Sequence, residues 1–372
     1  SSDARRTPPL YCTYKIRKAR TTMALISDAV RLGDLELKNR LVLAPLTRAR
    51  SGETRIPNEL MVDYYRQRAN AGLILTEATV IAENAVGYEH TPGLWNEKQV
   101  AAWKNIIDAV HEQDSKIMVQ LWHVGRISHP DLLAGETPVS ASALRPAGHV
   151  SLLRPKRAYV EPRALSIVEI KAIIAEYRQA AIYAKQAGFD GVELHAANGY
   201  LIDQFLQSST NQREDEYGGT VENRSRLLLE VVDVLIEVYG AGRVGVHLAP
   251  RGDSHDMGDE NPAETFAYVA EQLGQRHIAF IFTREYLAED SLSQLIREKS
   301  QVPYIANENL TIASAKQLLA DHQADAVAFG KAYIANPDLY QRILADAELN
   351  PLVAETLYGS GAEGYLDYPT LV

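Results

Sequence analysis

The sequence is poor in cysteine, in net positive charge and in long apolar runs. Cys12 is the only cysteine among 372 residues, which excludes a disulfide framework, a structural zinc cluster and a four-cysteine iron–sulfur site within the chain. Lys and Arg number 38 against 48 Asp and Glu, a net charge of −10, which argues against nucleic acid as a partner. No run of about 18 apolar residues suggests a membrane span. We expect a small-molecule partner and a reducing, cytoplasmic location.

Residues 1–22 differ in charge from the rest of the chain. They contain one acid, Asp3, and six basic side chains, Arg5, Arg6, Lys15, Arg17, Lys18 and Arg20. They lack the apolar stretch of a secretory signal. We interpret this segment as a disordered basic extension or a remnant of cloning, with a transit-like peptide as the alternative. No linker or low-complexity tract divides residues 23–372, so we predict one domain there.

From residue 41 onward, short apolar segments alternate with longer amphipathic ones, the pattern of βα units around a parallel sheet. Eight segments are typical of strands: 41–44, 73–76, 117–121, 191–194, 244–248, 278–282, 303–306 and 326–329. Helical patterns follow them at 58–70, 97–112, 166–187, 221–239, 262–275, 288–298, 311–320 and 337–345. Eight strand–helix pairs predict an α/β fold, the closed (β/α)8 TIM barrel.

The alternative fold is a doubly wound open sheet, which normally carries a glycine-rich turn after its first strand. Residues 45–47 read Pro-Leu-Thr and contain no glycine, which favours the barrel. The longest connection, residues 124–165, follows the third strand. In a barrel such a segment lies over the carboxyl-terminal mouth, so we expect it to form a lid or a pocket wall.

Polar side chains gather where the predicted strands end, which is where TIM barrels build their active sites. The set is Thr47, Arg48, Glu77, Gln120, His123, His195, Asn198, Tyr200, His247, Arg251, Arg284, Asn307, Glu308, Asn309 and Lys331. A barrel held by packing alone does not need such a set. We therefore expect a polar binding site at this mouth.

The ends of the last two strands are candidates for binding a phosphate, as the equivalent loops do in many barrels. Gly330 removes the Cβ that would block close approach, Lys331 supplies charge, and Thr311 begins the following helix. The alternative is an ordinary surface lysine, because a Gly-Lys pair at a strand end is weak evidence by itself.

His195, Asn198 and Tyr200 fall within one short loop after the fourth strand. An imidazole N–H and a carboxamide N–H can both donate to one substrate oxygen, which makes the β-carbon of a conjugated double bond open to hydride attack. A phenol, which is protonated at neutral pH, can then supply the α-carbon with a proton. The alternative is structural: His195 and Asn198 satisfy turn backbone groups and Tyr200 packs.

A metal site is not expected. His123 and His129 lack the spacing of known metal motifs, and no other ligand-type residues cluster with them in sequence. Trp122 and Tyr358 are candidates for an aromatic pocket around a planar ligand, although both residue types also occur in half-buried packing.

The chain resembles the Old Yellow Enzyme group of FMN-dependent ene-reductases over residues 32–371. The resemblance rests on ordered motifs at 39–40, 44–48, 120–126, 188–200, 217–219, 222–224, 336–339 and 367–370. It implies FMN held noncovalently at the barrel mouth, reduced by NADPH or NADH and reoxidised by an activated alkene.

The resemblance also implies residue roles. His195 and Asn198 are expected to bind the substrate oxygen, and Tyr200 to donate the proton. The residues expected around FMN are Pro45, Leu46 and Thr47 along the flavin, Ala78 and Gln120 at its pyrimidine end, and Asn309, Gly330 and Lys331 at the phosphate.

Three positions depart from the family pattern. His247 stands where arginine is usual, so a charge that would favour reduced flavin is present only when the imidazole is protonated, and nearby Arg251 is a candidate to compensate. Lys331 replaces a common arginine and offers a point charge in place of a bidentate fork. Glu308 replaces a frequent glycine beside the phosphate, so its carboxylate is expected to point away.

The sequence therefore predicts an NAD(P)H-dependent flavin ene-reductase that reduces enones, enals, maleimides or nitroalkenes. A reductase of nitrate esters, nitroaromatics or quinones and a non-catalytic flavin-binding barrel are the alternatives. The partner is a small molecule, with no nucleic acid and no membrane, and the protein is expected as a monomer or homodimer. The physiological substrate, the choice between NADPH and NADH and the stereochemistry are not predicted.

Overall fold

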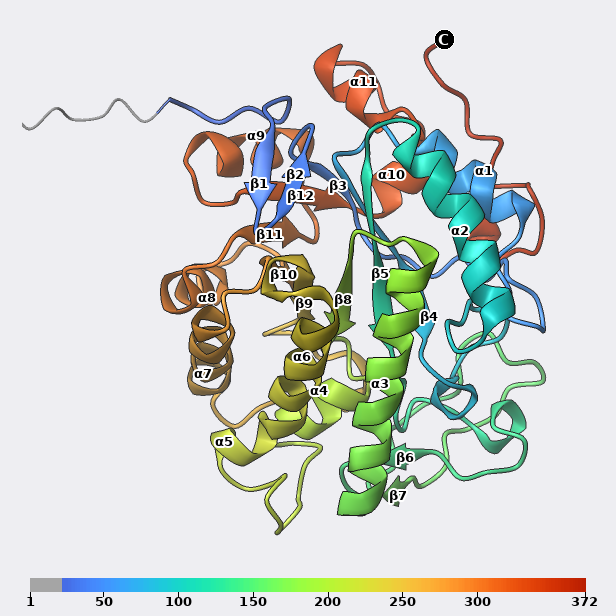
Figure 1. The fold of residues 1–372 in the computed structure, drawn as a ribbon, viewed down its shortest axis with the longest axis vertical. Helices are drawn as coiled ribbons and strands as arrows, with labels where there is room; N and C mark the ends of the chain where they lie inside the picture. The colour runs from blue at the N-terminus through green and yellow to red at the C-terminus, as the bar shows by residue number, and fades with distance from the viewer. Residues whose placement is uncertain (1–21) are drawn as a thin grey trace, which may run out of the picture.

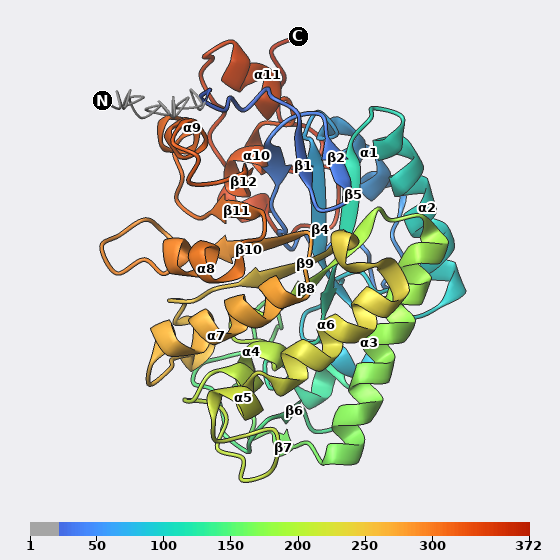
Figure 2. The ribbon, with the colours of Figure 1, turned by 60° about the vertical axis from the view of Figure 1, so that its left-hand side comes forward.

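Eight parallel strands close into a barrel, as predicted (Figures 1 and 2). The structure is a computed structural model that describes residues 22–372; the basic side chains of the predicted extension lie outside the described residues. In barrel order the strands are β3 (Leu41–Leu43), β4 (Leu73–Val80), β5 (Lys116–Trp122), β8 (Gly191–His195), β9 (Val244–Leu248), β10 (Phe280–Arg284), β11 (Tyr304–Asn307) and β12 (Ala326–Phe329).

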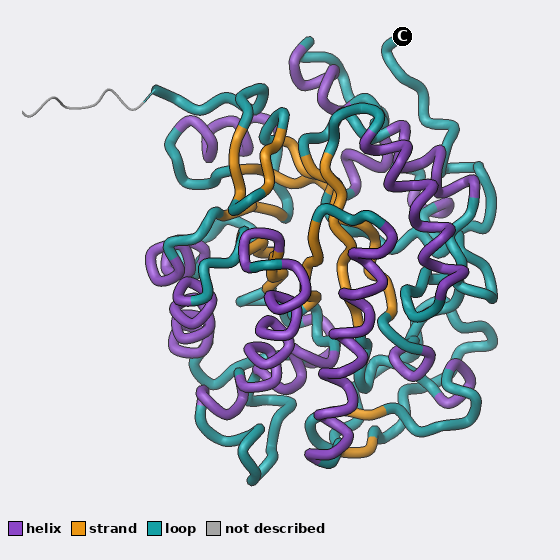
Figure 3. Tube along the Cα trace, in the orientation of Figure 1, coloured by secondary structure: helices purple, strands orange, loops and turns teal. Residues whose placement is uncertain are grey.

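Helices surround these strands on the outside (Figure 3). They are α1 (Glu59–Gln67), α2 (Glu97–His111), α3 (Ile167–Ala187), α4 (Leu201–Leu206), α5 (Val221–Arg224), α6 (Arg226–Tyr239), α7 (Pro262–Gln275), α8 (Ser293–Ser300), α9 (Ile312–Ala320), α10 (Lys331–Ala335) and α11 (Leu339–Leu344). Short 3-10 turns are η1 (Glu83–Ala85), η2 (Pro130–Leu132), η3 (Ala241–Arg243), η4 (Ser254–Asp256) and η5 (Ala354–Thr356).

Local chemistry explains where several helices begin. The Ser166 side chain accepts from the Glu169 amide and completes the expected capping box of α3, while Asn261 caps α7 ahead of Pro262. Two expectations need correction. The predicted helix 221–239 is interrupted at Ser225, and the predicted helix 288–298 begins only at Ser293.

A hairpin that the sequence analysis did not predict lies against one end of the barrel. Strands β1 (Val30–Leu32) and β2 (Leu35–Leu37) pair antiparallel around Gly33. Gly33 has φ +57°, and a Cβ there would lie 2.6 Å from the carbonyl oxygen of Gly242, so this turn requires glycine. The apolar side chains of the hairpin join the cluster of residues inside the barrel, which includes Leu32, Leu35, Leu37, Val42, Leu73, Met118, Phe280, Phe282 and Ile305.

The long segment 124–165 forms a wall beside the mouth, in line with expectation. It contains η2 and the short parallel pair β6 (Val139–Ser140) and β7 (Arg163–Ala164). Its residues Val150, Leu153 and Tyr159 pack with Tyr88 and Trp122 in one buried apolar cluster. Within residues 22–372, no helix has the length and apolar character that crossing a membrane requires.

The first prediction concerns the barrel interior. Gly245 on β9 lies opposite Phe280 on β10, and an added Cβ would lie 2.3, 2.5 and 2.8 Å from three carbons of the Phe280 ring. We expect Gly245→Ala to lower the free energy of unfolding by about 1–3 kcal/mol, because overpacking forces neighbouring groups apart. The urea midpoint measures this. Gly361→Ala, where the added Cβ meets nothing within 4 Å, is the control, and equal midpoints for the two variants would contradict the packing argument.

Candidate active site

A cavity of about 610 Å³ opens at the carboxyl ends of the barrel strands. Of the polar residues at the predicted strand ends, Arg48, Glu77, His123 and Arg251 do not line this cavity. Every residue assigned to the cofactor, the acceptor or the aromatic pocket does. These residues are Pro45, Leu46, Thr47, Ala78, Gln120, Trp122, His195, Asn198, Tyr200, His247, Asn309, Gly330, Lys331 and Tyr358. They come from strands or loops spread over more than 300 residues of sequence, so closure of the barrel is what brings them together.

Strand geometry aims several of these side chains. The register of β4 against β5 shifts between Leu75 and Ala78, an irregularity of the kind that re-aims side chains at barrel rims. Ala78 then pairs with Gln120. Further round the rim, His195 pairs with His247, and their rings stack with centroids 5.4 Å apart and planes 12° apart.

Asn198 occupies a left-handed backbone conformation with φ +59°, which Asn tolerates better than most residues. Two contacts hold it. Its carbonyl oxygen accepts from His255 Nδ1 at 2.7 Å, and its side-chain Oδ1 accepts from Arg284 Nη1 at 3.0 Å. The amide nitrogen Nδ2 makes no hydrogen bond within the described part of the chain and is left to donate into the cavity.

His195 presents a second donor. The Ala197 amide donates to Nδ1 at 3.4 Å, so the ring proton of the neutral imidazole lies on Nε2. Burial holds the pKa of His195 well below its ordinary value, and charge interactions with His247 and Arg284 lower it further. The imidazole is therefore neutral at physiological pH, and it offers a hydrogen bond without a full charge.

Aromatic side chains surround Tyr200. Trp122 meets its ring edge to face at 5.1 Å, and His195 does so at 4.9 Å. The Tyr200 hydroxyl lies 2.7 Å from the Tyr88 hydroxyl. Burial raises the pKa of Tyr200 above its ordinary value, so the phenol keeps its proton at neutral pH. Tyr358, which is 47% exposed, borders the open side of the cavity.

A buried polar group lies beneath the rim. Gln120 Nε2 donates to Glu193 Oε1 and to His247 Nδ1, both at 2.8 Å. Burial raises the pKa of Glu193 to about 8. Burial, together with the charge of Arg284, lowers the pKa of His247 to about 3. His247 therefore does not supply the positive charge that an arginine would provide.

Arg251 does not compensate for His247, contrary to the sequence interpretation. Its guanidinium donates to Glu285 at 2.9 Å and to Asp290 at 2.7 Å, and it does not line the cavity. The cations that do line the cavity are Arg284 and Lys331. The carboxylate of Glu308 is engaged by Arg284, with an Nε–Oε1 distance of 3.2 Å.

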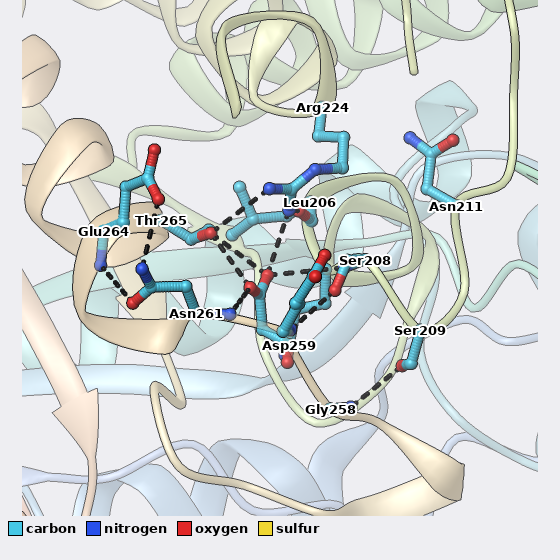
Figure 4. A network of polar contacts seen from close by, with 12 residues as sticks. Leu206, Ser208, Ser209, Asn211, Arg224, Gly258, Asp259, Asn261, Glu264 and Thr265 are labelled. Carbon is cyan, nitrogen blue, oxygen red and sulfur yellow. Dashed lines mark hydrogen bonds and ion pairs between the residues drawn. The ribbon is translucent and has the colours of Figure 1, made fainter. Parts of the chain in front are cut away.

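A second polar network braces the loop that carries His255 (Figure 4). Asp259, whose side chain is 1% exposed, accepts from Arg224 at 2.9 Å and from the Ser208 amide at 3.3 Å. The Ser209 hydroxyl accepts from the Gly258 amide at 3.0 Å. These contacts tie the loop after β9 to the segment after α4. Arg224, the last residue of the motif at 222–224, thus has a structural role, because it holds the Asp259 carboxylate.

The cavity suits FMN. Nε2 of His247 is a buried donor without a partner among the described residues, and the carbonyl and ring-nitrogen acceptors of a flavin would satisfy it. Pro45, Leu46 and Ala78 offer apolar surface for a flat ring, and Lys331 offers a cation for a phosphate. A larger cavity of about 810 Å³ is bordered by Glu83, Glu176 and His123, the last a member of the polar set at the strand ends. None of the residues assigned to the cofactor or the acceptor borders it.

The described residues contain no group of three or more His, Cys, Asp or Glu side chains placed to hold a metal ion.

A barrel mouth that combines hydrogen-bond donors, a phenol and apolar surface for a flat ring defines a cofactor-dependent barrel enzyme. Residues 28–350 match the NADH:flavin oxidoreductase / NADH oxidase family, and the chain belongs to that family. It is an FMN-dependent oxidoreductase of the Old Yellow Enzyme group that uses a nicotinamide nucleotide as reductant.

Similar proteins cover nearly the whole chain. A flavin oxidoreductase of Emericella nidulans is 38% identical over 373 residues, 91% of this chain and 96% of its own. The 12-oxophytodienoate reductase 1 of Oryza sativa subsp. japonica is 40% identical over 355 residues, 92% of each chain. The Old Yellow Enzyme homologue of Zymomonas mobilis superposes with a TM-score of 0.91 and 41% identity, covering 93% of this chain and 100% of its own.

A structure of morphinone reductase in complex with tetrahydroNAD is also similar. Its TM-score is 0.89 and its identity 42%, and the match covers 93% of this chain and 98% of that chain. The fold, the family and the cofactor predicted from the sequence are thus confirmed.

Sequence reasoning missed four residues that contact the assigned ones. They are Tyr88, which bonds Tyr200; His255, which bonds Asn198; Glu193, which bonds Gln120; and Phe282, whose ring lies 4.4 Å from that of His247. Glu193 and Phe282 could have been found, because each lies within a predicted strand close to its end. Tyr88 and His255 lie in loops where no periodic pattern indicates contact.

The second prediction concerns Glu193. Because its pKa in the folded protein is about 8, against about 4.3 in an unfolded chain, the folded state keeps a proton that the unfolded state releases. Stability therefore falls as the pH rises between these two values. Raising the pH from 5 to 9 is expected to lower the free energy of unfolding of the unsubstituted protein by about 1 kcal/mol or more relative to that of Glu193→Gln, which has no carboxyl group to ionise at this position. Urea midpoints at both pH values test this. The exposed Glu237→Gln is the control, and a stability difference independent of pH would refute the assignment.

Proposed function

We propose that the enzyme reduces the carbon–carbon double bond of activated alkenes: enones, enals, maleimides and nitroalkenes. The observation that carries the proposal is a pair of donors, His195 Nε2 and Asn198 Nδ2, that have no partner among residues 22–372. Both border one cavity, and the Tyr200 phenol contacts the imidazole. The reductase names of the related proteins support it. Within the proposal, residues 23–372 form the FMN-binding barrel domain.

His195 and Asn198 polarise the substrate. Two hydrogen bonds to its carbonyl or nitro oxygen stabilise the negative charge that develops there as the β-carbon is attacked. His195 is buried and Asn198 is half-buried, and both are held in place before substrate binds, so they need little reorganisation during the reaction. The neutral state of His195 keeps its proton on the imidazole, so that the donated hydrogen bond does not become a proton transfer. FMN, when bound, would supply the hydride chemistry, with a nicotinamide nucleotide as the reductant.

Tyr200 supplies the proton to the α-carbon. Its position between Trp122 and His195 fixes the ring, and its hydroxyl contact with Tyr88 gives a route by which the phenolate regains a proton. A buried phenolate is costly, so the proton is released only as charge builds on the acceptor.

An anaerobic titration tests the proposed function. The purified yellow holoenzyme is expected to lose its visible flavin absorbance on addition of NADPH or NADH and to regain it on addition of 2-cyclohexenone. Colour that fails to return with any of the four alkene classes, while a quinone or a nitrate ester restores it, would favour the alternative reductase activity. That outcome is possible because those acceptors need the flavin hydride without a tyrosyl proton.

Substitution of Tyr200 separates the two half-reactions. We expect Tyr200→Phe to slow reoxidation by 2-cyclohexenone by about 10²–10⁴-fold, the usual contribution of a positioned general acid, and to leave flavin reduction by the nucleotide nearly unchanged. Stopped-flow absorbance measures each step. Tyr177→Phe, which removes a buried hydroxyl without a partner in the described chain, is the control. Equal slowing of both half-reactions by Tyr200→Phe would remove Tyr200 from the proton-transfer step.

A further inference from the structure

Arg284 connects the end of one barrel strand to two of the loops that surround the mouth. It ends β10, and its side chain is 42% exposed. Nη1 donates to Asn198 Oδ1, in the loop after β8, at 3.0 Å. Nε donates to Glu308 Oε1, in the loop after β11, at 3.2 Å. Neither contact was predicted, because the three residues are separated by 86 and 24 positions in the sequence.

The contact with Asn198 decides which end of the carboxamide faces the cavity. An amide oxygen and an amide nitrogen have nearly the same shape, so an unrestrained Asn can present either one. Only the nitrogen can donate to a substrate oxygen, whereas the oxygen would repel it. A guanidinium carries donors and no acceptor, so it can bond only Oδ1. It thereby holds Nδ2 on the side that remains free.

We propose that Arg284 is a positioning residue that fixes the Asn198 amide as a donor toward the acceptor oxygen, and that Glu308 holds Arg284 in place for this task. The inference rests on the proposed role of Asn198 in binding the acceptor. It assigns a function to two residues that the sequence resemblance left without one.

The backbone at Glu308 supports the second half of the proposal. Its φ is +87°, and the next residue, Asn309, has φ +52°. A left-handed conformation at a residue with a Cβ is unfavourable. The ion pair with Arg284 offsets this cost. It also commits the carboxylate to a cation within the cavity lining, where it would otherwise repel a phosphate.

The Arg284 charge acts on the same groups. It contributes to the lowered pKa of His195 and opposes part of the rise in the pKa of Tyr200. The guanidinium therefore favours a neutral imidazole donor and a more acidic phenol while it orients the amide. One side chain thus influences all three groups assigned to the acceptor.

The proposal is tested by binding, with the oxidised FMN-loaded enzyme and 2-cyclohexenone as a neutral probe. The dissociation constant is read from the change in flavin absorbance. We expect Arg284→Met to raise it about tenfold, the effect of losing one well-oriented hydrogen bond, and Arg284→Lys to recover part of the loss. Arg178→Met is the matched control, because Arg178 is also 42% exposed and also pairs with a glutamate, on the outer surface of α3.

A double-mutant cycle distinguishes orientation from other effects. In an Asn198→Ala background no amide remains to be oriented, so most of the loss of affinity caused by Arg284→Met is expected to disappear. The same loss in both backgrounds, or an unchanged dissociation constant in Arg284→Met alone, would overturn the proposal. Glu308→Gln is a second variant in case Arg284→Met fails to fold. It is expected to weaken binding about threefold, and an effect that persists in the Asn198→Ala background would also count against the proposal.

The outcome is separable from that of the proposed function. If the unsubstituted enzyme reduces none of the four alkene classes, the proposed function fails. If it binds and reduces 2-cyclohexenone and the Arg284 variants match it, only the positioning role fails. A carboxylated enone, 3-oxocyclohexene-1-carboxylate, serves as a further arm. A loss confined to that anionic probe would mean that Arg284 binds substrate directly, which overturns the assignment as a positioning residue.

Discussion

Lateral closure of the parallel sheet is the constraint on which the site depends. Each barrel strand pairs with two neighbours, so the register fixes which side chains adjoin at the mouth. His195 lies opposite His247, and His247 lies opposite Phe282. Their rings follow one another at 5.4 and 4.4 Å between centroids. A shift of one residue in either pairing would turn these rings away from the cavity. The order of groups around the rim is therefore a property of backbone pairing.

Burial then decides the charge of these groups. Beneath the rim, Glu193 is held near neutrality and His247 is kept neutral, because an ion without a partner is unfavourable there. Permanent charge is placed at the more exposed edge, on Arg284 and Lys331. The protein thus meets its ligands with neutral donors in the interior and with cations at the entrance. With a neutral His247 on the fifth strand, the positive charge of the cavity lies on Arg284 and Lys331.

Local patterns predicted the features that short stretches of sequence determine. Buried β-branched runs gave all eight barrel strands, and the residues at their ends gave the lining of the cavity. The hairpin formed by β1 and β2 was missed because three-residue strands are too short to show alternation. The Arg284 contacts were missed for a different reason. A bond across 86 residues depends on which loops meet in space, and neither periodicity nor spacing reports that. The same limit explains the error about Arg251, whose acidic partners lie 34 and 39 residues away.

The loops at the mouth lack a regular backbone hydrogen-bonding pattern. Their conformations therefore depend on side-chain contacts with one another. Asn198, Glu308 and Asn309 all have positive φ, and such conformations persist only where surrounding contacts hold them. Arg284 joins the loop that contacts the acceptor to the loop beside the expected phosphate. Because Arg284 donates to a side chain in each of these two loops, the conformation of one loop restrains that of the other through a single guanidinium.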